Sequence, residues 1–206
     1  MHFDPRARGT NLSPTHSTRT VARAVLLALT LAIQISPIAL YAGTHLPDPP
    51  PAQIPIVHGT TLAGDSITLP DALHGKIGIL VLGFSQHSRD QVTPWGKRLA
   101  ADYHTAPDVL YFEMPMLAAV PRLLRSMVVH SLKSSVPERA QPRFLPVTED
   151  EAHWRTLAHY SNTSADDAYV LLVDQTGRVL WQTQGAPTDA TYTALHHQVE
   201  ALRSHL

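Results

Sequence analysis

The chain has 206 residues, of which 44% are hydrophobic and 16% are charged, with a formal net charge of −1 and no cysteine. This length and composition fit one globular domain with its own core and exclude wholesale disorder. The near-neutral balance gives no reason to expect nucleic acid as a partner. The absence of cysteine excludes disulfides, thiolate nucleophiles and Cys-ligated metal centres.

Residues 1–42 are interpreted as a signal peptide or an N-terminal membrane anchor. Four arginines precede residues 24–42, an uncharged run of 19 residues (AVLLALTLAIQISPIALYA). A basic flank before an apolar stretch is typical of a secretory signal, but the run also approaches the ~20 residues that span a bilayer. If it stays uncleaved, it associates the protein with the membrane. Both forms predict an extracytoplasmic protein, exported or anchored to the inner membrane, because positive charge stays inside.

Residues 43–55 are proline-rich and predict a semi-rigid linker, so the folded domain is expected over residues 56–206. This domain begins with two short strands around a glycine-containing turn at residues 62–65, followed by a helical turn. Residues 77–84 (IGILVLGF) are continuously apolar, which predicts a central strand covered on both faces.

A helix is expected after this strand, with Ser88 and Gln91 as a capping pair and with Pro94 kinking or restarting it. Thr148 and Glu151 have the spacing of a capping box for a later helix that reaches about Tyr160. The remaining predictions are a strand at 109–113, an amphipathic helix at 118–135, a loop at 136–147, a hairpin at 168–173 and 178–183, and a last helix after Thr188.

This order of elements predicts an α/β fold, in which helices flank both faces of a mixed sheet. Together with the segment GDSITLPDALHGKIGILVLGF, it resembles the thioredoxin-like fold with a peroxiredoxin-type N-terminal extension, over residues 54–206. The predicted signal or anchor helix would precede this domain.

In thioredoxin-like proteins the reactive cysteine follows this central strand at a helix N-terminus, where free N–H groups and the helix dipole stabilise a thiolate. The matching stretch here is Ser85-Gln86-His87-Ser88. A hydroxyl forms no disulfide, so these four residues are interpreted as a vestigial active site. The family's proline before the hairpin is also replaced, because Asp166, Asp167 and Ala168 occupy that place.

Other functions of this stretch remain open. Ser85 and His87 could serve a hydrolase, although the final glycine of Gly-x-Ser-x-Gly is missing, and the simpler role of the serines is to satisfy free N–H groups. No histidine spacing typical of a metal site occurs in the sequence, and no cofactor is expected. A structural domain that holds a ligand is a further alternative.

The helix expected at 118–135 has basic residues beside an apolar face. Such helices bind membrane surfaces or grooves of partner proteins, while the alternative is that the apolar face packs on the sheet. The predicted partner-binding residues are Arg122, Leu123, Arg125, Met127, Val128 and Lys133.

Several segments here are similar to the mitochondrial ATP-synthase assembly factor family: YFEMP at 111–115, PRLLR at 121–125, SVP at 135–137 and YVLLVDQTGRVLW at 169–181. The resemblance implies a cysteine-free, non-redox and non-enzymatic protein that chaperones a membrane protein partner by contact. One departure concerns location, because the family's mitochondrial member acts on the matrix side, whereas this N-terminus resembles an export signal.

Overall fold

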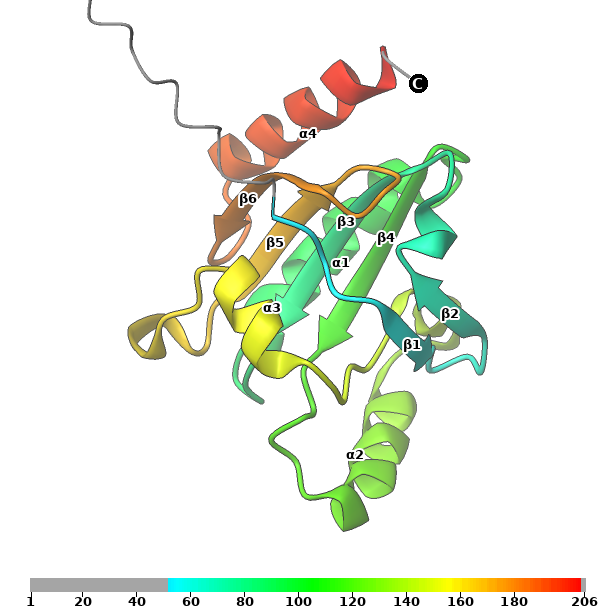
Figure 1. The fold of residues 1–206 in the computed structure, drawn as a ribbon, viewed down its shortest axis with the longest axis vertical. Helices are drawn as coiled ribbons and strands as arrows, with labels where there is room; N and C mark the ends of the chain where they lie inside the picture. Colours follow the sequence, from blue (N-terminus) through cyan, green and yellow to red (C-terminus); the bar gives the residue numbers. More distant parts are fainter. Residues whose placement is uncertain (1–51, 205–206) are drawn as a thin grey trace, which may run out of the picture. The chain divides into compact units, whose positions relative to one another are not determined.

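The computed structural model describes residues 52–204 (Figure 1). The predicted signal or anchor at 1–42 and the linker up to residue 51 lie outside the described residues. Among residues 52–204, none of the helices combines the length and hydropathy that crossing a bilayer requires.

Four strands form the central sheet, in the order β4-β3-β5-β6. β3 (Ile77–Gly83) pairs in parallel with β4 (Val109–Pro115) and antiparallel with β5 (Ala168–Val173), which pairs antiparallel with β6 (Val179–Gln184). The two inner strands, β3 and β5, are buried at every position, which is why their sequences are apolar without alternation. The predicted central strand and its parallel neighbour are confirmed.

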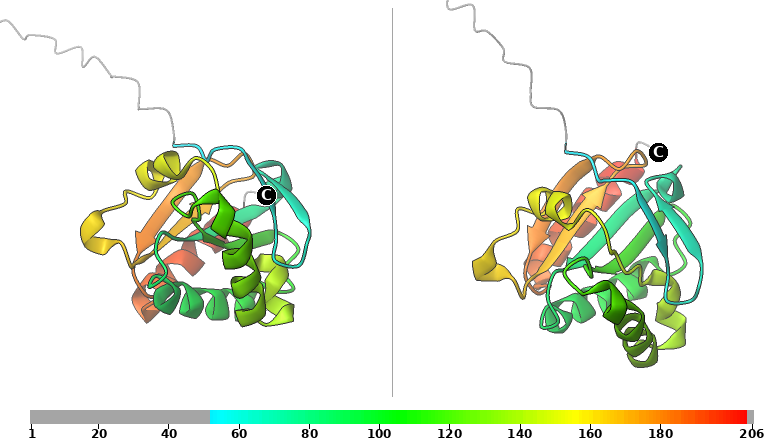
Figure 2. Two further views of the ribbon diagram at one scale, coloured as in Figure 1. Left: turned by 90° about the horizontal axis from the view of Figure 1, so that it is seen from below. Right: turned by 60° about the horizontal axis from the view of Figure 1, so that its bottom comes forward.

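Two helices cover one face of this sheet (Figure 2). α1 (Arg89–Tyr103) contributes Trp95 and Leu99 to the core on this face, and α4 (Asp189–Arg203) contributes Leu195 and Val199. Thr188 and Thr191 form a complete capping box at the start of α4, where the last helix was expected.

The other face is covered by smaller elements. The hairpin of β1 (Val57–Thr60) and β2 (Ser66–Leu69), the turn η1 (Asp71–Leu73) and α3 (Glu151–Leu157) pack on it. Ile54 is buried in the same core, so the folded domain reaches back into the predicted linker.

Three local predictions are wrong. Ser88 makes no side-chain capping bond at α1. Pro94, where a kink or a restart was expected, lies inside α1, so only the restart is excluded. At α3 the residue before the first turn is Asp150, whose φ of 54° is left-handed, and no side chain caps the helix. The segment expected to be a loop contains the 3₁₀ helix η2 (Glu138–Arg143), and η3 (Asn162–Ser164) lies beyond α3.

α2 (Arg122–Ser135) stands away from the sheet at the lower end of Figure 1. It is the amphipathic helix expected from the sequence, and it starts at Arg122 rather than at residue 118. No residue of α2 is buried, in contrast to the five buried residues of α1.

Candidate functional site

The two segments with predicted functional residues lie at one end of the sheet. Because β3 and β4 are parallel, the residues that follow them emerge at the same edge. Ser85 follows β3, and the loop leading to α2 follows β4. We call the segments that follow β3 and β4 the first and the second exit of the sheet. The Met116 N–H donates to the Gly83 carbonyl oxygen at 2.8 Å, so a hydrogen bond joins the two exits directly.

At the first exit, the hydroxyl groups are engaged in internal hydrogen bonds. The Ser85 hydroxyl accepts a hydrogen bond from the Ser88 N–H at 3.0 Å and donates one to the Asp166 carboxylate at 2.6 Å. The Ser88 hydroxyl donates to the Ser85 carbonyl oxygen at 2.7 Å. Ser85 therefore satisfies a free N–H at the helix start, as expected, whereas Ser88 does not.

Gln91, predicted to cap the helix, connects it to the β5 entrance instead. Its amide nitrogen donates to the Asp167 carboxylate at 2.9 Å, and its amide oxygen accepts from the Ala168 N–H at 3.4 Å. The residues that replace the proline of thioredoxin-like proteins thus bind the start of α1 by hydrogen bonds. The polar groups joined at this site are the hydroxyl of Ser85, the carboxamide of Gln91 and the carboxylates of Asp166 and Asp167. None of these groups can exchange a disulfide.

The geometry does not form a serine-histidine pair. His87 is largely exposed, and its Nδ1 lies 3.9 Å from the Asp166 carboxylate. Among residues 52–204, no hydrogen bond joins His87 to Ser85, and the Ser85 proton points to Asp166 instead. A histidine base must be within hydrogen-bond reach of the hydroxyl that it activates, so this arrangement does not provide a nucleophile of the usual kind.

At the second exit, α2 exposes its apolar side chains. Leu123 is 94% exposed, Met127 is 62% exposed and Leu124 is 45% exposed. Leu123 and Met127 are four residues apart and lie on the same side of the helix. These three side chains are therefore not covered by the sheet, whereas Val128, Val129 and Leu132 of the same helix are partly buried.

Polar contacts at both ends hold α2 in place. Arg125 donates to the carbonyl oxygens of Val120 at 3.0 Å and Ala118 at 2.9 Å, which fixes the loop before the helix. At the other end, the buried Gln141 amide donates to the carbonyl oxygens of Lys133 and Val136, both at 3.1 Å. These bonds satisfy backbone groups that a helix end leaves free, and they need no buried side chain on α2 itself.

A charged and aromatic cluster links the loop to the Ser85 region. The Ala119 N–H donates to the Glu151 carboxylate at 3.2 Å, and Glu151 pairs with Arg155 at 2.6 Å. The Arg155 guanidinium lies over the ring of Tyr160, 4.1 Å from its centroid, and 5.5 Å from that of Phe84, the residue before Ser85. Glu151, expected to cap α3, thus serves the α2 loop instead.

The six predicted partner-binding residues divide into two groups. Arg122, Leu123, Met127 and Lys133 are exposed and form one accessible surface. Arg125 and Val128 are half-buried, and Arg125 is occupied by its carbonyl contacts, so its position is a structural one.

Glu113 is a buried carboxyl group that the sequence analysis did not single out. It lies on β4 under α1 and is 6% exposed. Burial raises its pKa to about 8, so it is largely protonated at neutral pH. A methyl group at Gly96 would overlap the Glu113 carboxyl group, which explains a glycine inside α1. Two features of the sequence could have indicated this buried carboxyl group: a glutamate within an apolar strand and a glycine in the middle of the helix that packs on it.

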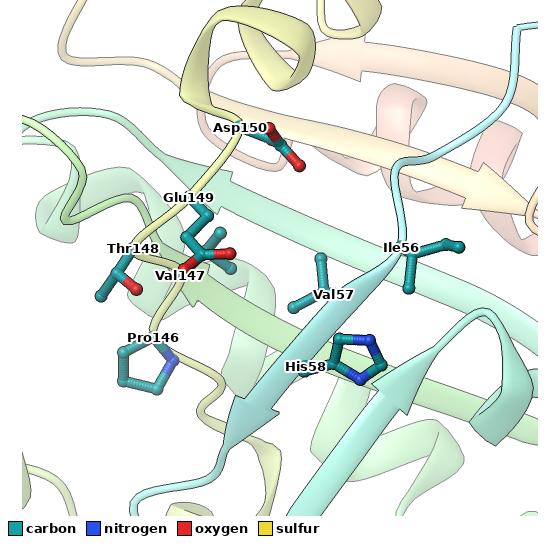
Figure 3. A pocket seen from close by; sticks show the side chains of 8 residues that line it. All are labelled: Ile56, Val57, His58, Pro146, Val147, Thr148, Glu149 and Asp150. Atoms are coloured by element: carbon teal, nitrogen blue, oxygen red, sulfur yellow. The ribbon is translucent and has the colours of Figure 1, made fainter.

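Two recesses in the surface are small. One, between β1 and the segment before α3, has a volume of about 30 Å³, and Figure 3 shows His58 and Asp150 on its two sides. The other, of about 240 Å³, lies at the opposite end of the sheet beside Lys76 and Leu180. Pockets for small molecules usually measure about 300–1,000 Å³, so neither recess supports a ligand-holding role. Within residues 52–204, no three metal-binding side chains cluster together.

Known proteins show similarity at the level of family and fold. A sequence model of the family described as ATP10 protein matches residues 51–202. No curated protein sequence matches. BsSco, described as a member of the Sco family of cytochrome c oxidase assembly proteins, superposes with a TM-score of 0.50 at 15% identity, covering 75% of this chain and 95% of its own.

Two bacterial structures give similar values. A putative thiol:disulfide interchange protein DsbE from Chlorobium tepidum has a TM-score of 0.48 at 19% identity, covering 73% of this chain and 95% of its own. A thioredoxin family protein from Chlorobium tepidum TLS has a TM-score of 0.47 at 13% identity, covering 74% and 98%. The superposition on BsSco supports the thioredoxin-like fold and nothing finer. The expected mixed sheet with flanking helices is thereby confirmed.

Proposed function

Because this chain belongs to the ATP10 protein family, whose members are ATP synthase assembly factors, we propose that it assists assembly of the ATP synthase at a membrane without catalysing a reaction. It acts by contact with a membrane-embedded component, and α2 brings it to that component. It works outside the cytoplasm, because residues 24–42 act as its export signal or membrane anchor.

The observation that carries this proposal is the contrast between the two exits of the sheet. Where thioredoxin-like proteins have a reactive thiol, Ser85 is held between Ser88 and Asp166. Beside it, α2 exposes Leu123 and Met127 to solvent. Exposed apolar side chains that gather on one projecting element are typical of an interaction surface.

Complementation of cells that lack the protein tests this function. Intact ATP synthase is measured on native gels after expression of the full chain or its variants. Wild type and Ser85→Ala with His87→Ala should restore assembly, whereas Leu123→Asp with Met127→Asp should not. A matched control is Ile56→Asp, because Ile56 is 66% exposed but lies beside β1.

Two results would refute the proposal. Loss of assembly in the folded Ser85/His87 variant would show that these side chains perform chemistry. Full assembly with the folded α2 variant would show that α2 is not the contact surface.

A further inference from the structure

The exposed part of α2 lies at the end of a projection. Figure 2 shows α2 extending away from the body of the domain, with the loop from β4 at its start. The exposed apolar side chains, Leu123, Leu124 and Met127, all lie in the first two turns of the helix. A partner must therefore accept a convex apolar end.

Charge separates this projection from the rest of the domain. Residues 114–137 contain Arg122, Arg125 and Lys133 and no aspartate or glutamate. Outside this segment, residues 52–204 contain 15 acidic and 9 Lys or Arg residues. The projection is thus the positively charged end of an acidic domain, and it is complementary to a negatively charged surface.

The size of the apolar patch argues against a protein as its main occupant. Three side chains supply roughly 300 Å² at most, whereas a stable protein interface buries about 800 Å² on each partner. A lipid surface needs no matching groove, and it accepts a few apolar side chains between its headgroups while basic residues stay at the headgroup level.

We propose that α2 docks onto an anionic lipid bilayer, with Leu123, Leu124 and Met127 of its first two turns among the acyl chains and with Arg122 and Lys133 at the phosphates. This inference rests on the proposed function and deepens it, because it states that α2 reaches the membrane component through the surrounding lipid. Arg125 and Gln141 hold the helix in its projecting orientation before it meets the bilayer.

The absence of cysteine makes a direct test available in the full chain. Leu123→Cys provides a single attachment site for a polarity-sensitive fluorophore, and Gln198→Cys on the exposed surface of α4 is the matched control. Residues 24–42 are present in both proteins, so any difference between the two probes reports on α2. The membranes are vesicles of phosphatidylcholine alone, or of phosphatidylcholine and phosphatidylglycerol in equal amounts.

We expect the probe at position 123 to shift to shorter wavelength and brighten several-fold with the anionic vesicles only. Brominated acyl chains should quench it, and high salt or Arg122→Gln with Lys133→Gln should reduce the response. The probe at position 198 should not change.

Two outcomes would overturn the inference. The first is no response at position 123 with either vesicle, which would assign α2 to a protein partner. The second is an equal response at positions 123 and 198. In each case the complementation result stands independently, so failure of lipid docking is distinguishable from failure of the proposed function.

Discussion

Helices α1 and α2 each follow one of the two parallel strands, but only α1 packs on the sheet. α1 buries Trp95 and Leu99 completely, whereas α2 leaves Leu123 almost fully exposed. In α1 the apolar stripe contributes to the free energy of folding, and in α2 the same kind of stripe remains available for a contact. Amphipathic periodicity alone therefore does not distinguish a helix that builds the core from one that serves binding.

The largest expected effect is a loss of stability when a buried side chain of α1 is removed. Trp95 is fully buried, and its indole N–H donates to the Gly185 carbonyl oxygen at 2.8 Å. Trp95→Ala should lower the free energy of unfolding by about 3–5 kcal/mol, because it opens a cavity and leaves that carbonyl unpaired. Urea unfolding followed by circular dichroism measures this change. An effect below about 1 kcal/mol would contradict the role given to α1.

The next effect is pH-dependent and concerns the acid between α1 and β4. The Glu113 carboxyl titrates near pH 4.5 when exposed and near pH 8 when buried. Between these values the folded state binds more protons than the unfolded state, so the free energy of unfolding falls as pH rises from about 4.5 to about 8.

Glu113→Gln removes this titration while keeping the shape of the side chain. At pH 8 the variant should be more stable than wild type by on the order of 4 kcal/mol, and near pH 4.5 the two should be similar. Urea unfolding across this pH range measures the difference. Parallel profiles of the two proteins would show that Glu113 is not buried in its protonated form.

A smaller effect is expected at the vestigial site. Ser85→Ala removes two hydrogen bonds, one from the Ser88 N–H and one to Asp166, and should cost about 1 kcal/mol of unfolding free energy. Gln86→Ala, at an exposed neighbour, is the control. Thermal unfolding of the three proteins measures both changes, and equal melting temperatures would mean that Ser85 does not stabilise the helix start.

The smallest effect on stability is expected for a substitution on the exposed face of α2. Leu123→Ser exchanges a side chain that is already solvated, so the free energy of unfolding should change by less than about 0.5 kcal/mol. Leu99→Ser in α1 is the matched substitution at a fully buried position, and it should be several-fold more costly. Comparable losses in both variants would indicate that α2 packs against the domain in solution.

The sequence predicted the elements that depend on local pattern. Continuous apolar runs predicted β3 and β5, and the last helix was expected after Thr188, where α4 begins. Helix caps that depend on distant residues were missed. Glu151 binds the Ala119 N–H across 32 positions, and Gln91 binds Asp167 across 76, so neither is free to cap its own helix.

The sequence by itself determined the absence of thiol chemistry, because a chain without cysteine cannot exchange disulfides, and it determined the order of strands and helices through their hydrophobic periodicity. The tertiary structure alone decided which apolar faces are covered. Burial depends on what the rest of the chain places against a face. Against α2 it leaves Leu123 and Met127 uncovered and places polar contacts at the two helix ends. Against Glu113 it places α1, whose Gly96 leaves room for the carboxyl group.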